Sequence, residues 1–255
     1  MTALPQAFLD APIAHRGLHN CAQGRPENSR AACRAALDAG YGIEIDLQLS
    51  RDGVAMVFHD ETLERLTHQT GLVREWGAEA LCATALTGGH EGVPTLSQVL
   101  SLVAGRAALL VELKDQHGAM GPTDGVLESA VGAALAGYSG PVAVMSFNPN
   151  MIARLAILLP DVPRGLVTCD YAAEDWPMLD EATRARLRGI PDYTRVGASF
   201  ISHQARDLGR DRVRALRDTG APVLTWTIRS AREEAQARQI AANITFENYL
   251  PLKRA

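Results

Sequence analysis

The feature that most constrains the fold of this chain is a regular alternation between short apolar runs and segments with helical patterning. Runs such as LLVEL at 109–113 and VAVMSF at 142–147 are apolar on both faces, which is typical of parallel strands covered by helices. Nearly every interval between the runs has the caps and apolar spacing of a helix. The principal strands are expected near residues 13, 43, 109, 142, 165, 199, 223 and 244.

Eight β/α units in 255 residues predict an α/β fold of the (β/α)8 TIM barrel type, with a doubly wound open sheet as the alternative. A return strand over 54–59 follows the second principal strand, and residues 60–93 then read as an irregular loop excursion. Because no linker or low-complexity tract divides the chain, we expect residues 1–255 to form a single domain.

Two carboxylates lie one pleat apart on the second expected strand. The run GIEIDLQL at 42–49 alternates apolar and polar residues, so Glu44 and Asp46 project from the same face. At a separation of ~4 Å and an effective dielectric constant of ~20, two such charges repel each other by roughly 4 kcal/mol. Water, a shared proton or a cation has to relieve this repulsion. A half-exposed strand with solvated acids is the simplest interpretation of the pair alone. Other residues of the chain must therefore show whether the pair belongs to a functional site.

Further polar groups fall where other expected strands end. His15 and Arg16 end the first strand, His59 closes the hairpin of the second, and Glu112 and Lys114 end the third. In a TIM barrel the C-terminal ends of all strands meet at one rim, so these side chains are expected to converge.

The types of these residues limit the chemistry that they can perform. Glu44, Asp46 and Glu112 are oxygen donors, which favour Mg²⁺ or Ca²⁺ over zinc. Arg16 and Lys114 would add positive charge beside such an ion, and that arrangement suits a phosphate group.

His15 and His59 complete the set as a candidate general acid and general base near neutral pH. A divalent ion, a phosphate clamp and two imidazoles together indicate phosphodiester cleavage. Trp226, at the end of the seventh expected strand, either packs the top of the barrel or lines a substrate pocket. A nucleotide-dependent kinase is disfavoured, since the chain has no Walker-type glycine loop.

Composition excludes some partners. A net charge of −4 and an isoelectric point near 6.0 provide no basic stripe, which argues against nucleic acid. No run approaches the ~18 apolar residues of a membrane span, and the N-terminal segment does not resemble a signal peptide. The four scattered cysteines fit free thiols in a reducing compartment. We therefore expect a cytoplasmic protein without a stable membrane anchor; the sequence does not determine its oligomeric state.

Several motifs, in order and at close spacing, resemble one enzyme family. HRG at 15–17, PENS at 26–29, EIDLQLSRDG at 44–53 and VFHD at 57–60 resemble the glycerophosphodiester phosphodiesterases. The likeness extends through VPTLSQVL at 93–100, VELK at 111–114 and TWTI at 225–228, and is thin after residue 150.

The resemblance implies a TIM barrel that uses a divalent ion to hydrolyse small glycerophosphodiesters to glycerol 3-phosphate and an alcohol. It implies that residues 60–93 are a short insertion after the second strand that helps to shape the substrate entrance. The roles that it implies cover seven residues, namely metal ligation by Glu44, Asp46 and Glu112, acid–base catalysis by His15 and His59, and phosphate binding by Arg16 and Lys114. One departure is Thr245-Phe246-Glu247-Asn248, where the family usually has a Thr-Asp pair before a proline.

Three alternative functions remain compatible with these residues. They are a phospholipase-like lyase that releases a cyclic phosphate, a lysophospholipase D acting on a lipid, and a catalytically silent barrel that binds phosphorylated ligands. The two histidines argue against the last, because binding alone needs no acid and base. Glu27 and Asn28 are expected to be structural, and the remaining histidines to lie outside the site: His19, His68, His90, His117 and His203.

Overall fold

The chain folds into a closed parallel barrel, seen in a computed structural model that describes residues 2–252. Strand β1 pairs with β9 on one side and with β2 on the other, which closes the sheet. The predicted TIM barrel is therefore confirmed, and the open-sheet alternative is wrong. The eight barrel strands are β1 (Ile13–Ala14), β2 (Gly42–Leu49), β4 (Leu109–Leu113), β5 (Val142–Ser146), β6 (Arg164–Thr168), β7 (Phe200–Gln204), β8 (Val223–Ile228) and β9 (Asn243–Phe246).

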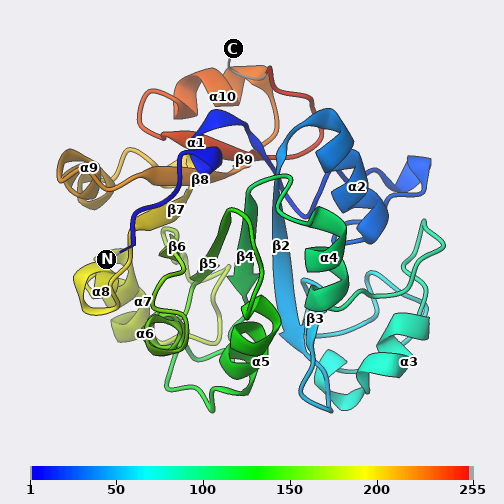
Figure 1. Cartoon of the computed structure of the whole chain (residues 1–255). Helices are drawn as coiled ribbons and strands as arrows, with labels where there is room; N and C mark the ends of the chain where they lie inside the picture. The colour runs from blue at the N-terminus through cyan, green and yellow to red at the C-terminus, as the bar shows by residue number, and fades with distance from the viewer. Residues whose placement is uncertain (1, 253–255) are drawn as a thin grey trace.

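Helices surround the strands on the outside of the barrel (Figure 1). Several of them begin at a side chain that accepts a hydrogen bond from the first helical turn, as Ser29 does for α2 and Thr95 for α4. Asn28 and Ser29 are both residue types that favour the N-cap position, and in the structure Ser29 caps α2 by accepting from the Ala32 N–H. The α-helices after β1 are α2 (Arg30–Ala39), α3 (Ala78–Ala83), α4 (Leu96–Val103), α5 (Val126–Leu135), α6 (Pro149–Leu158), α7 (Glu181–Arg188), α8 (Asp192–Arg195), α9 (Asp211–Asp218) and α10 (Ala231–Ala237).

Alternation along the strands separates an outer apolar layer from the barrel interior. On β2, Ile43 and Ile45 pack outward with the apolar residues of the helices, whereas Glu44 and Asp46 alternate with them and point inward. The lower interior is apolar and is filled by Ile13, Leu110, Ala143, Val167, Phe200 and Leu224. The charged side chains of the interior therefore lie at its C-terminal end, whereas Asn243 is a buried polar residue at the opposite end.

A short N-terminal helix, α1 (Ala7–Asp10), was not expected from the sequence. Its Phe8 is fully buried with the interior residues, and the Asn243 side-chain amide donates to the Phe8 and Ala11 carbonyls at 2.8 and 2.7 Å. Four residues are too few for a helical apolar period, which is why the pattern missed it.

Residues 60–93 form the expected excursion beside β3 (Ala55–Val57), which pairs antiparallel with β2. The excursion contains a 3-10 turn, η2 (Val73–Glu75), and helix α3, and Figure 1 shows it next to β3. It has an apolar cluster of its own, which includes Phe58, Leu63 and Leu81. Two further 3-10 turns are η1 (Cys21–Gln23) and η3 (Ala205–Asp207).

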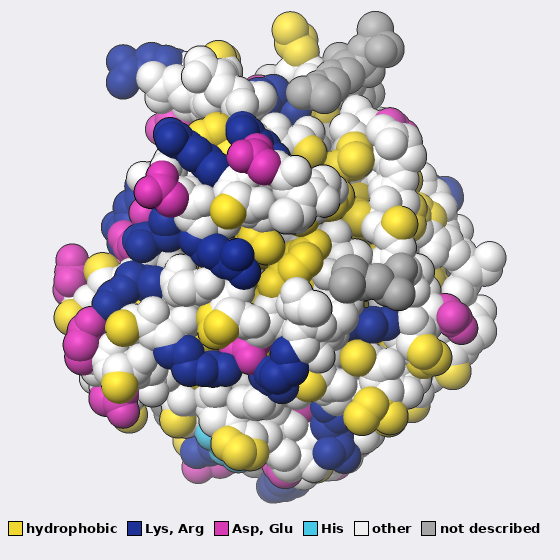
Figure 2. All heavy atoms as spheres, turned by 90° about the vertical axis from the view of Figure 1, so that its left-hand side faces the viewer, with side chains coloured by type: hydrophobic (Ala, Val, Ile, Leu, Met, Phe, Trp, Pro, Cys, Tyr) yellow, Lys and Arg dark blue, Asp and Glu magenta, His cyan; other side chains and the backbone are white. Residues whose placement is uncertain are grey.

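The surface is mixed in charge, and no helix among residues 2–252 is long and apolar enough to span a bilayer. On the face shown in Figure 2, Lys and Arg side chains lie among Asp and Glu rather than in a stripe of one sign.

Gly17 allows β1 to pass directly against α2. Its φ is +76°, and a Cβ at this position would lie 2.8 Å from the Ala32 carbonyl carbon and 2.9 Å from the Ala32 Cβ. Gly24 has a similar φ of +70°, but nothing lies within 4 Å of its would-be Cβ. The two glycines therefore have the same backbone requirement and differ in the space around them.

We expect Gly17→Ala to lower the free energy of unfolding by about 2–4 kcal/mol, the sum of left-handed strain and overpacking, and Gly24→Ala by only about 1–2 kcal/mol. Urea unfolding of both variants measures the difference. Equal losses in the two variants would contradict the close approach at Gly17.

Candidate functional site

The C-terminal rim of the barrel brings together the residues singled out in the sequence. A cavity of about 180 Å³, the central cavity, opens there between β1, β2, β4 and β8. It is lined by His15, Arg16, Glu44, His59, Glu112, Lys114 and Trp226. Asp46 is buried beside it, in contact with Lys114 and Arg16.

Three buried carboxylates form the floor of the site. Strand register places Asp46 directly opposite Glu112, and one oxygen each of Glu44, Asp46 and Glu112 lies within 4.8 Å of the others. Burial and the charges of the other two carboxylates raise the pKa of Glu44 well above its ordinary value. Its Oε1 is buried and has no hydrogen-bond partner among the described residues.

This triad fits a divalent cation. Its ligands are all carboxylate oxygens, the donors that Mg²⁺ and Ca²⁺ take, and the unpartnered Glu44 Oε1 is a free ligand atom. A cation between the three groups would also remove the repulsion that raises the pKa of Glu44.

Two protein cations adjoin the triad. Lys114 Nζ lies 2.7 Å from Asp46 Oδ1 and 2.6 Å from Glu112 Oε1, and Arg16 Nε lies 3.3 Å from Asp46 Oδ2. Burial acts to raise the pKa of Asp46, but Lys114, His59 and Arg16 outweigh it and hold that pKa far below its usual range. Burial likewise acts to lower the pKa of Lys114, and the two carboxylates raise it instead.

Arg16 is fixed at three points. It has a left-handed φ of 55°, which turns its backbone N–H toward Glu44 Oε2 at 2.9 Å. Its guanidinium donates to Glu27 at 2.7 Å as well as approaching Asp46. The strained backbone thus places both ends of one residue against the carboxylates of the site.

Asn28 also belongs to the site rather than to the helix cap. It is fully buried with a φ of 58°, and its side-chain amide donates to Asp46 Oδ2 at 2.9 Å while its oxygen accepts from the Asp46 backbone N–H at 3.2 Å. The expectation that Asn28 and Glu27 only shape the loop was therefore too narrow, because both contact site residues.

His15 is held by a carboxylate from the last strand. Its Nδ1 lies 2.7 Å from Glu247 Oε2, and Arg229 contacts Glu247 Oε1 at 2.8 Å. The hydrogen bond from His15, and then the nearby His19, hold the pKa of Glu247 far below its usual value, so Glu247 is an acceptor. His15 Nδ1 must then carry the proton, which leaves Nε2 available to a ligand. Burial lowers the pKa of His15, and the bond to Glu247 opposes that effect.

His59 has an equivalent partner. Its Nδ1 lies 2.7 Å from Asp60 Oδ1, and Arg65 contacts Asp60 at 2.6 Å and Glu27 at 2.8 Å. Burial acts to raise the pKa of Asp60, but Arg65 and His59 lower it well below its ordinary value. Both imidazoles are thus oriented by an ionised carboxylate that is itself held by an arginine.

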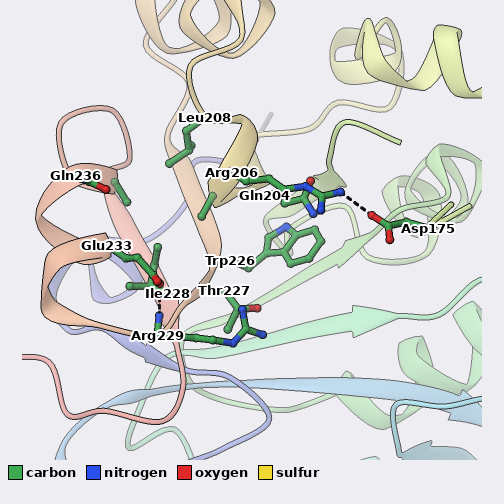
Figure 3. A pocket seen from close by; sticks show the side chains of 12 residues that line it. Asp175, Gln204, Arg206, Leu208, Trp226, Thr227, Ile228, Arg229, Glu233 and Gln236 are labelled. Carbon is green, nitrogen blue, oxygen red and sulfur yellow. Dashed lines mark hydrogen bonds and ion pairs between the residues drawn. The ribbon is translucent and has the colours of Figure 1, made fainter. Parts of the chain in front are cut away.

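Trp226 separates the central cavity from two larger clefts. The arginine cleft, of about 660 Å³, lies beside Gln204, Arg206, Arg229 and Gln236 (Figure 3). The aromatic cleft, of about 510 Å³, lies beside Glu61, Asp115, Met120, Phe147 and Trp176. The Trp226 indole N–H donates to the Ser202 carbonyl at 3.0 Å, which fixes the ring between these spaces.

Sequence reasoning missed Glu247 and Asp60 as partners of the histidines. His19 was expected to lie outside the site, but its Nε2 is 3.7 Å from Glu247. His203 is outside it, since this buried side chain bonds to Thr168 and Asp207 on the outer side of β7. The adjacency of Asp60 to His59 was visible in the sequence, whereas Glu247 lies 232 residues from its partner.

Sequence comparison identifies relatives of this chain. Residues 15–245 match the Glycerophosphoryl diester phosphodiesterase family. A protein of Caldanaerobacter subterraneus named glycerophosphodiester phosphodiesterase is 27% identical over 241 residues, covering 91% of this chain and 90% of its own. A protein of the same name from Bacillus subtilis is 25% identical over 259 residues, covering 93% of this chain and 83% of its own.

Solved structures support the fold. An Oleispira antarctica phosphodiesterase, in complex with the product sn-glycerol-3-phosphate, superposes with a TM-score of 0.76 at 23% identity, covering 95% of both chains. A glycerophosphodiester phosphodiesterase from Parabacteroides distasonis gives a TM-score of 0.72 at 21% identity over 92% of both. With the family match spanning nearly the whole barrel, the chain belongs to the Glycerophosphoryl diester phosphodiesterase family.

Proposed function

We propose that this chain hydrolyses glycerophosphodiesters to glycerol 3-phosphate and an alcohol by two-histidine acid–base catalysis. The observation that carries this proposal is that two imidazoles, each oriented by an ionised carboxylate, line the same cavity as a buried carboxylate triad. The names of the relatives and the glycerol 3-phosphate product in the Oleispira complex agree with it.

Glu44, Asp46 and Glu112 would hold Mg²⁺ or Ca²⁺ in this scheme. Such an ion, when bound, supplies a Lewis acid at a phosphoryl oxygen and neutralises the triad. Arg16 and Lys114 are proposed to bind the phosphate, because both line the cavity and keep their positive charge there. Their charge stabilises the oxygens of the transition state more than those of the diester.

The proton transfers are assigned to the two imidazoles. One accepts a proton from water as the water oxygen forms a bond to phosphorus, and the other donates a proton to the alcohol oxygen as its bond to phosphorus breaks. The atoms of one water molecule are thus shared between glycerol 3-phosphate and the released alcohol. Glu247 and Asp60 act as positioning residues that keep each Nε2 directed away from its partner carboxylate.

His15→Ala and His59→Ala should each lower kcat by about 10²–10⁴-fold, because each removes one proton transfer. Hydrolysis of glycerophosphocholine measures the rate, and circular dichroism checks the fold. Full activity in either variant would refute the assignment. Phosphorus NMR of the wild-type product distinguishes glycerol 3-phosphate from the cyclic phosphate of a lyase.

Metal removal should change stability as well as activity. We expect EDTA to lower the unfolding temperature, and Mg²⁺ or Ca²⁺ at ~100 times its Kd to restore about 2.7 kcal/mol of stability. Glu44→Gln should abolish this metal-dependent gain while making the metal-free protein more stable, because it removes the buried charge whose pKa is raised. The matched control is Glu79→Gln at an exposed position of α3. A metal response in Glu44→Gln equal to that of the wild type would exclude the triad as the ion site.

Glu247→Gln tests the orientation of His15. Loss of the carboxylate removes a contact that raises the pKa of His15, so the limb of the kcat–pH profile that belongs to His15 should move to lower pH. We expect kcat to fall by about 10-fold or more while KM changes little, since Glu247 does not line the central cavity. Glu247→Asp should recover part of the rate. A profile that does not move would show that Glu247 only supports the fold.

A further inference from the structure

The aromatic cleft has walls of exposed ring surface beside the reacting groups. Phe147 packs against Trp176 with ring centroids 5.0 Å apart and meets Trp226 edge-on at 5.6 Å. Met120 extends the same wall, and His59, Glu112 and Lys114 form the boundary with the central cavity. A group attached to the phosphate can therefore reach these rings without leaving the protein.

Two carboxylates of the same cleft, Asp115 and Glu61, form no ion pair among the described residues. Asp115 accepts hydrogen bonds from the Met120 N–H and the Asn148 amide, which are neutral donors. Glu61 is exposed, and no hydrogen bond or ion pair reaches its carboxylate from residues 2–252. Lys114, the one lysine lining the cleft, is bound to Asp46 and Glu112 of the triad. The cleft thus combines aromatic faces with two carboxylates that have no ion-pair partner among residues 2–252.

The arginine cleft lies on the other side of Trp226 and holds charges of both signs. Figure 3 shows Arg206 and Arg229 on either side of the indole, with Gln204 next to Arg206 and with Asp175 joined to Arg206. Gln204 Oε1 is buried and has no hydrogen-bond partner among the described residues. Arg206 pairs with Asp175 at 2.6 Å and Arg229 with Glu247 at 2.8 Å, and among the described residues Trp226 is the only aromatic side chain that lines this cleft. The arginine cleft therefore offers an ammonium group fewer ring faces than the aromatic cleft does.

We propose that the aromatic cleft binds the alcohol half of the substrate and selects alcohols that bear an ammonium or quaternary ammonium group. Aromatic faces attract such cations through the ring quadrupole, and Glu61 and Asp115 add Coulombic attraction. The inference rests on the proposed function, because it concerns the leaving group of that same reaction.

The test compares two diesters that differ only in charge. Glycerophosphocholine has a trimethylammonium group, and its 3,3-dimethylbutyl analogue replaces the nitrogen by carbon at the same shape. We expect the wild type to favour the choline diester by about 10-fold or more in kcat/KM, which corresponds to roughly 1.4 kcal/mol. Glu61→Gln and Trp176→Leu should each reduce this ratio. The first variant removes a negative charge, and the second replaces an aromatic ring by a side chain that is also apolar but has no ring.

The exposed Glu79→Gln variant serves as the matched charge control and should keep the wild-type ratio. Glu61 is exposed, so Glu61→Gln remains informative if Trp176→Leu fails to fold. Equal kcat/KM for the two diesters, or a ratio unchanged in both Glu61→Gln and Trp176→Leu, would overturn the inference and leave the hydrolase assignment intact. If the wild type hydrolyses neither diester with Mg²⁺ or Ca²⁺ present, the proposed function itself fails.

Discussion

Repulsion among three buried carboxylates is the constraint around which the rim of this barrel is built. The register between β2 and β4 sets Asp46 against Glu112, and the pleat brings Glu44 to the same side. Inside a protein this arrangement is costly unless positive charge is close. Lys114 and Arg16 provide part of that charge, but burial and then repulsion from Asp46 and Glu112 still raise the pKa of Glu44. The positive charge that the triad still lacks is the electrostatic reason to expect a divalent ion there.

The charges extend outward from the triad as one connected network. Arg16 joins Asp46 to Glu27, Glu27 joins Arg16 to Arg65, and Arg65 continues to Asp60 beside His59. The imidazole of His59, which we propose to be catalytic, is thereby connected to a carboxylate of the triad through alternating charges. Networks of this kind favour one arrangement of side chains, since a rotation of any member leaves a partly buried charge unpaired.

Much of the fold and part of the site could be predicted from the sequence. The eight strands were recognisable because their apolar runs are short and covered on both faces, and the triad because strand periodicity fixes which side chains share a face. Local patterns could not supply contacts made by barrel closure. The partner of His15 is Glu247, at a position where the family motif is altered, and only the pairing of β1 with β9 brings the two together.

Local ambiguity accounts for the other differences. Asn28 and Ser29 are both good cap residues, and the choice between them depends on Asp46, which takes the Asn28 amide. The character of the two clefts was also invisible in the sequence, because their walls come from loops that follow six different strands. Trp176 and Asp115, for example, acquire a shared surface only when the rim is assembled.

The closure of the barrel by β1 has a consequence for biosynthesis. This strand has two residues and lies between β2 and β9, so its second edge stays unpaired until the ninth strand leaves the ribosome. A nascent chain that already contains the whole carboxylate triad still lacks the residue that orients His15. A polypeptide released before residue 243 would therefore contain the candidate ion ligands and the His59–Asp60 pair, but would lack the carboxylate that orients His15.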